Sequence, residues 1–186
     1  FFIFFLRRNE WSAFWFAMLV TIAFVRTLMV GERLFYQAFP DFPLVLGYKI
    51  EYLDFIPLTT VFLLFLYNLD RIPMHGKIVK VYAMITAVEC LLVSFTSVYF
   101  FSSLLPLFIV VMIAGLIIAL AFMINLMRKQ QGYKLLFVVS CFVIIAAVND
   151  VLYSLQIINT FFFAHYVFAL LLLAQSYILA SRFSKS

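Results

Sequence analysis

Charged residues are scarce in this sequence. Aspartate, glutamate, lysine and arginine make up 11% of the 186 residues, whereas a soluble domain needs roughly 25% to cover its surface. Hydrophobic residues make up 67% and aromatic residues 20%, and the mean hydropathy is +1.15. These values exclude a water-soluble globule, a disordered chain, a coiled coil and a collagen-like chain.

Cysteine and histidine are also rare. Cys90 and Cys141 both lie in long apolar runs, so we exclude a disulfide framework and interpret them as packing residues. His75 and His165 fall at opposite membrane faces of the predicted topology, which excludes a metal or haem site shared between them. Zinc-ligand spacing, glycine-rich phosphate loops, nucleophile motifs and a mid-span lysine are absent. We therefore expect no cofactor, no metal site and no enzyme activity within these residues.

Long apolar runs fill the rest of the sequence. One transmembrane helix and a short connection need about 27 residues, so the chain has room for slightly fewer than seven spans. We predict an all-α polytopic membrane helical bundle that forms a single transmembrane domain over residues 1–186, with six complete transmembrane helices and the end of a first one. The predicted spans are 1–6 (partial), 11–30, 51–69, 78–99, 104–127, 135–153 and 161–180.

Two details of these spans bear on the fold. Residues 1–6 are too few to cross about 30 Å of hydrocarbon, which predicts the last turns of a helix that starts before Phe1. Pro57 is expected in the first turns of the third span, where its missing N–H costs little.

The basic residues predict the orientation. If the segment after residue 6 is cytoplasmic, three basic residues (Arg26, Arg33 and Lys49) fall outside and ten fall inside. The ten are Arg7, Arg8, Arg71, Lys77, Lys80, Arg128, Lys129, Lys134, Arg182 and Lys185. This positive-inside bias predicts a cytoplasmic C-terminus, and it assigns the net charge of +5 to topology and anionic lipid rather than to nucleic acid.

Several polar or ionisable residues lie within the predicted spans, where they are costly and are candidates for ligand binding or switching. They gather toward the outer half of the bundle and comprise Arg26, Asp54, Glu89, Asn149, Asp150 and His165. Arg26 could pair with Asp54, Asp150 or Glu89. Glu89 is the deepest, near the middle of the fourth span. The cluster is either an outward-facing polar pocket that binds a signal or changes its pairing, or a set of helix-to-helix hydrogen bonds with one snorkelling arginine.

Short segments along nearly the whole chain resemble bacterial seven-transmembrane receptors with diverse intracellular signalling modules. The segments are FLRRNE at 5–10, RTL at 26–28, GERL at 31–34, KIEYL at 49–53, FLLFL at 62–66, NDVLY at 149–153, IINT at 157–160, AQS at 174–176 and ASRFS at 180–184. The resemblance implies a seven-helix receptor domain in a bacterial inner membrane that acts in signal transduction.

The resemblance also implies partners. Members of that family carry an extracellular or periplasmic sensory domain before the first helix. After the seventh they carry a cytoplasmic output module such as a kinase, a cyclase or a phosphatase, and neither is present in these 186 residues. The last span would pass a helix shift through Arg182, Phe183 and Lys185 into the output module, and the receptor would act as a homodimer. The alternatives are a small-molecule or proton-coupled transporter, which has neither an internal repeat nor a pair of broken helices to support it, and a structural membrane subunit.

Overall fold

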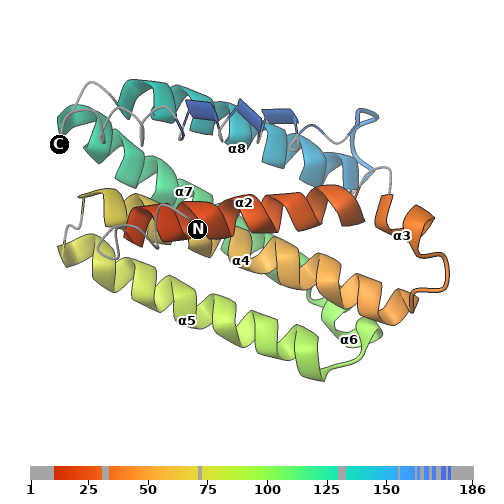
Figure 1. Cartoon of the computed structure of the whole chain (residues 1–186). Helices are drawn as coiled ribbons and strands as arrows, with labels where there is room; N and C mark the ends of the chain where they lie inside the picture. Colours follow the sequence, from red (N-terminus) through yellow and green to blue (C-terminus); the bar gives the residue numbers. More distant parts are fainter. Residues whose placement is uncertain are drawn as a thin grey trace. The chain divides into compact units, whose positions relative to one another are not determined.

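The computed structural model describes residues 11–30, 34–70, 73–129, 133–154, 156–161, 163, 166, 167, 169, 170, 173, 174 and 176 (Figure 1). The described elements are all helical, with no strand among them. They are α2 (Trp11–Met29), α3 (Leu34–Ala38), α4 (Leu44–Asp70), α5 (Pro73–Phe95), α6 (Val98–Ser103), α7 (Leu105–Lys129) and α8 (Lys134–Ser154). The described residues between 166 and 176 are helical as well.

Four of the described helices are long and apolar enough to cross a membrane. These candidate spans are Trp11–Met29, Leu44–Leu69, Met74–Phe95 and Leu105–Arg128. Helix α8 occupies the range in which a sixth span is predicted. The predicted partial span at 1–6 lies outside the described residues, and the predicted span at 161–180 is described only in part.

Helix α4 begins at Leu44 rather than at residue 51, directly after Pro43. The N–H of Gly47 donates to the Pro43 carbonyl at 3.1 Å, which closes the first turn. Pro57 consequently lies inside the helix, and its predicted place in the first turns is wrong. Helix α5 is also displaced toward the N-terminus, because it starts at Pro73 and stops at Phe95, before Ser97 and the short α6.

The chain forms two compact units, Phe1–Ala119 and Leu120–Ser186. In the first unit α4 lies between α2 and α5 and runs antiparallel to both (Figure 1). A ring contact between Phe16 and Phe65, 6.1 Å between centroids, joins the first half of α2 to the C-terminal half of α4. The first half of α7 joins this unit through Phe108, which contacts Tyr52 of α4 at 6.2 Å.

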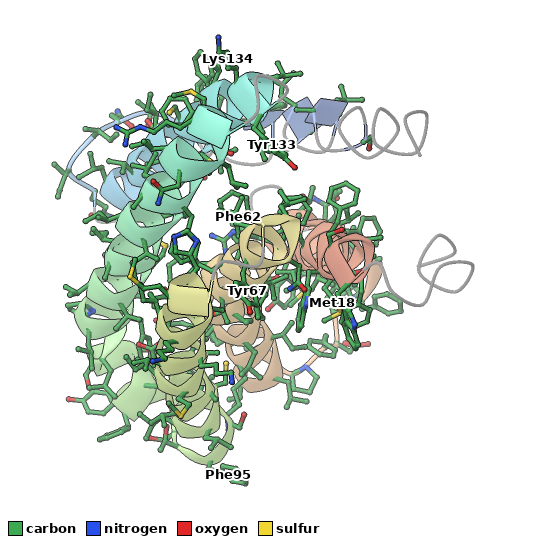
Figure 2. All side chains as sticks on the ribbon, turned by 90° about the vertical axis from the view of Figure 1, so that its left-hand side faces the viewer. Met18, Phe62, Tyr67, Phe95, Tyr133 and Lys134 are labelled. Atoms are coloured by element: carbon green, nitrogen blue, oxygen red, sulfur yellow. The ribbon has the colours of Figure 1, made fainter. Side chains whose placement is uncertain are left out.

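The helices of the first unit turn apolar side chains outward and keep polar ones inside. From Val79 onward the buried positions of α5 recur every three or four residues and comprise Val79, Tyr82, Thr86, Glu89 and Val93. The exposed positions of α5 carry large apolar side chains, and Figure 2 shows Phe95, 84% exposed, pointing away from the other helices at the end of α5. This arrangement is suited to a lipid environment, because polar side chains find hydrogen-bond partners only in the interior between the packed helices.

The second unit contains Leu120–Lys129 of α7, helix α8 and the described residues that follow. Helix α8 has the same inverted pattern, with apolar side chains such as Val138, Phe142 and Ile145 exposed. Ser140 and Asp150 are buried on the same helix. Both units therefore place polar side chains in their interiors.

Candidate functional site

An ion pair joins α2 to α4 in the first unit. Nη1 of Arg26 lies 3.9 Å from Oδ2 of Asp54, and the two side chains are 23% and 3% exposed. The Arg26 guanidinium also lies over the ring of Phe55, 5.2 Å from its centroid, in a cation–π contact. Arg26 is in the last turn of α2, where a cation interacts favourably with the helix dipole. Asp54 is one of the three partners that the sequence allows for Arg26.

The pair is electrostatic without a direct hydrogen bond. Neither carboxylate oxygen of Asp54 has a hydrogen-bond partner among the described residues, although both are buried. A buried charge is costly unless hydrogen bonds and an opposite charge compensate it. The Arg26–Asp54 contact therefore leaves part of that cost unmet.

Glu89 is buried on the inner face of α5, 6% exposed, and its Oε1 atom lacks a hydrogen-bond partner within the described part of the chain. It lies one helical turn from Thr86 on one side and from Val93 on the other. The Thr60 hydroxyl donates to Oγ1 of Thr86 at 2.8 Å, which joins α4 to α5. The deepest ionisable residue predicted from the sequence thus lies in the interior of the first unit.

Helix α7 also contributes to this polar interior. The Tyr82 hydroxyl donates to the Val111 carbonyl at 3.0 Å, which joins α5 to α7. Gly115 makes this approach possible, because a Cβ there would meet the Tyr82 ring and lie 2.5 Å from the methyl carbon of Thr59. We call the buried side chains of Thr59, Thr60, Tyr82, Thr86 and Glu89 the polar strip.

An apolar cluster lies beside the polar strip at the α6 side. Its buried members are Ile56, Val93, Phe101 and Phe108. Tyr52 packs against it and contacts the Phe101 ring at 4.8 Å between centroids. The cluster separates the polar strip from the α5–α6 turn.

Near that turn the Lys49 ammonium donates to the Ser94 carbonyl at 2.8 Å, which ties α4 to the last turn of α5.

In the second unit Asn149 and Asp150 bind the chain that follows α8. The Phe163 N–H donates to Oδ1 of Asp150 at 2.7 Å, and Nδ2 of Asn149 donates to the Phe161 carbonyl at 3.0 Å. The Thr160 hydroxyl donates to Oδ1 of Asn149 at 3.0 Å. These bonds give both predicted site residues partners from within the chain.

The structure thus divides the predicted site residues between the two units. Arg26, Asp54 and Glu89 lie in the first unit, and Asn149 and Asp150 in the second. His165, Arg182, Phe183 and Lys185 lie outside the described residues. Among the residues that are described, no group of three or more histidine, cysteine, aspartate or glutamate side chains could hold a metal ion.

Sequence reasoning did not single out Tyr82, Thr60 and Thr86 for the polar strip. Tyr82 and Thr86 are four residues apart and Glu89 follows three later, so all three share one face of α5. Polar residues at that spacing in an apolar helix are a signal that could have identified them. Thr60 carries no such signal, because its role depends on the register between α4 and α5.

A family model described as 7TM diverse intracellular signalling matches residues 1–182. The chain belongs to this family. It is a multi-pass membrane protein, and its membership of the 7TM diverse intracellular signalling family indicates a membrane receptor-like domain. Comparison with curated proteins and with solved structures found no match.

Proposed function

We propose that this 7TM domain relays an extracellular or periplasmic signal to a cytoplasmic output module that follows it in the same polypeptide. The observation that carries the proposal is the ion pair between α2 and α4, in which the partly buried Arg26 faces a buried Asp54 carboxylate that lacks direct hydrogen bonds to the described residues. A relay needs two helix packings of similar free energy, and a ligand can shift their populations only by its differential affinity for them. An incompletely compensated charge pair is a place where a small displacement changes that balance.

The free energy needed to shift the two helix packings can be compared with the free energy of an ion pair. A shift of the two packings from 1:99 to 99:1 requires about 5.5 kcal/mol of differential binding. Removing one partner of a buried ion pair costs about 3–5 kcal/mol in proteins. The Arg26–Asp54 pair is therefore of the right magnitude to influence the equilibrium.

The proposed direction of the relay follows the basic residues. Ten of the 13 lysines and arginines fall on one side of the predicted topology, which supports a cytoplasmic C-terminus. The location in a bacterial inner membrane is what the family resemblance implies. The signal would leave through Arg182, Phe183 and Lys185, and the receptor would act as a homodimer. The enzyme activity, where there is one, would belong to the output module.

The relay is tested in the full-length protein with its own output as the readout. The coding sequence beyond Ser186 is read first, because the proposal expects a cytoplasmic output module there. Arg26→Gln and Asp54→Asn are then compared with the unmodified protein at matched amounts in the membrane. We expect each variant to shift the signal dose required for half-maximal output by about tenfold, the equivalent of 1.4 kcal/mol.

A matched control separates the pair from general charge loss. Lys80→Gln removes one positive charge from an exposed position of α5, and we expect an unchanged dose response. The exchange Arg26→Asp with Asp54→Arg retains both charges and is expected to restore part of the response. Unaltered dose responses in both single variants would contradict the proposed relay.

A further inference from the structure

Pro57 interrupts the hydrogen-bond ladder of α4 beside the polar strip. Because proline has no N–H, the carbonyl of Leu53, four residues earlier, has no backbone donor from position 57. Transmembrane helices tolerate proline where a neighbouring helix or a side chain satisfies the freed carbonyl. The carbonyl of Leu53 therefore calls for a donor from outside the α4 ladder.

Two contacts between α4 and α5 show which part of α5 lies beside Pro57. The Thr60 hydroxyl bonds to Thr86 at 2.8 Å. One turn earlier on α4 and two turns later on α5, Ile56 and Val93 pack in the same apolar cluster. The stretch of α4 from Ile56 to Thr60 therefore lies along the stretch of α5 from Thr86 to Val93. Pro57 falls within the first stretch and Glu89 within the second.

Glu89 also lacks a hydrogen-bond partner among the described residues for one of its side-chain oxygens. Its side chain is buried and its Oε1 atom lacks a hydrogen-bond partner within the described ranges. As a carboxylate it would require donors, whereas the carboxylic acid carries an O–H of its own and requires an acceptor. A freed backbone carbonyl is such an acceptor, and Pro57 frees that of Leu53. Leu53 packs against the apolar cluster that contains Val93, one turn from Glu89.

We propose that Glu89, as the carboxylic acid, donates a hydrogen bond to the Leu53 carbonyl that Pro57 leaves unpaired. The bond replaces the one that α4 lacks and ties α5 to α4 at the proline. Asp54 directly follows Leu53. The proline, the ion pair with Arg26 and the bond from Glu89 are thereby concentrated in one short stretch of α4.

A double-mutant cycle at constant pH tests the bond in the purified full-length protein in lipid nanodiscs, with the thermal midpoint of unfolding as the readout. Glu89→Leu removes the donor and is expected to lower the midpoint. Glu89→Gln retains an N–H donor and is expected to remain near the unmodified protein. Pro57→Ala supplies a backbone N–H to Leu53, so Glu89→Leu in that background should cost about half as much or less.

Pro106→Ala provides the matched control for the cycle. Pro106 lies in the first turn of α7, where the N–H of a residue is unpaired in any case. The effects of Pro106→Ala and Glu89→Leu should therefore add. An equal loss for Glu89→Leu with and without Pro57→Ala would overturn the proposal.

A spectroscopic measurement keeps the proposal testable if Glu89→Leu does not fold. Infrared difference spectra between the unmodified protein and Glu89→Gln should show a protonated carboxylic acid band that the variant lacks. In Pro57→Ala that band should shift to higher frequency, because its acceptor is now bonded within α4. A carboxylate band in its place would show that Glu89 is not a donor and would refute the proposed bond.

Discussion

The backbone N–H of Phe163 donates a hydrogen bond of 2.7 Å to the carboxylate of Asp150, 13 residues earlier in the chain. Asn149 adds a donor to the Phe161 carbonyl and an acceptor for the Thr160 hydroxyl. Two adjacent side chains near the end of α8 thus hold three of the residues that lead into the next helical segment. Because each bond involves the following chain, the pair holds that chain against the end of α8.

Removing the Asp150 acceptor should destabilise the second unit. Asp150→Ala leaves the Phe163 N–H without this partner, and a hydrogen bond to a charged group contributes about 1.5–3 kcal/mol. Asp150→Asn retains Oδ1 as an acceptor and is expected to lose less than half of that. The measurement is the free energy of unfolding in detergent, with Asp41→Ala, an exposed acid before α4, as the control. Wild-type stability in Asp150→Ala would rule out this role.

The close approach of α7 to α5 predicts the cost of a methyl group at Gly115. A Cβ at this position would overlap the Tyr82 ring and lie 2.5 Å from the Thr59 methyl carbon. Tyr82 is buried and tied to Val111, so its ring cannot move aside freely. We expect Gly115→Ala to lower the free energy of unfolding by about 1–3 kcal/mol. Thr59→Ser, which removes the methyl group, should restore part of the loss.

Gly76→Ala is the matched control for that substitution. A Cβ there would lie 2.9 Å from the Tyr67 hydroxyl oxygen, but the Tyr67 side chain is only partly buried and its end can swing away. The loss should therefore be smaller than for Gly115→Ala. An equal loss at the two glycines would contradict the role of the Tyr82 contact, because the change in helix propensity favours alanine at both positions.

The sequence predicts the helical membrane fold because composition alone excludes the alternatives, and the family resemblance is confirmed by the match over residues 1–182. The helix boundaries are less predictable. Leu44 to Tyr48 could be a loop on sequence grounds, whereas the structure shows this segment as the start of α4, with the Gly47 N–H bonded to the Pro43 carbonyl. A helix that starts at residue 51 would have Pro57 in its first turns, where a proline is common, whereas α4 starts at Leu44 and continues through Pro57.

The residues of the candidate site are predictable where the sequence of a single helix is enough to identify them. Arg26, Asp54 and Glu89 are conspicuous because ionisable residues are costly in apolar helices. Their individual partners depend on the register between helices, which no local pattern encodes. The sequence therefore allows three acidic partners for Arg26, and the structure places Asp54 at 3.9 Å.

The hydrogen bond between Thr60 and Thr86 predicts a measurable coupling between α4 and α5. Interhelical hydrogen bonds in membrane proteins contribute about 0.6 kcal/mol on average and up to about 1.7. We expect Thr60→Val and Thr86→Val to lose less together than the sum of their separate losses, by an amount in that range. The test is a double-mutant cycle of unfolding free energies in detergent.

Thr21 supplies the control for this cycle. Its hydroxyl donates to the Ala17 carbonyl within α2, at 2.9 Å, so Thr21→Val and Thr86→Val should show no coupling. Additive losses for Thr60→Val and Thr86→Val would show that the 2.8 Å hydrogen bond between the two side chains makes no measurable contribution to stability.

The asymmetric distribution of basic residues predicts which connections face the cell exterior. Pro40 is exposed in the turn between α3 and α4, and Gln131 follows α7 in the sequence. Single cysteines are introduced at these positions after Cys90 and Cys141 are replaced by alanine. A membrane-impermeant maleimide should label Pro40→Cys in intact cells, whereas Gln131→Cys should react only after permeabilisation, which also shows that both thiols are reactive. Labelling of Gln131→Cys but not Pro40→Cys in intact cells would reverse the topology, because ten basic residues would then face outward.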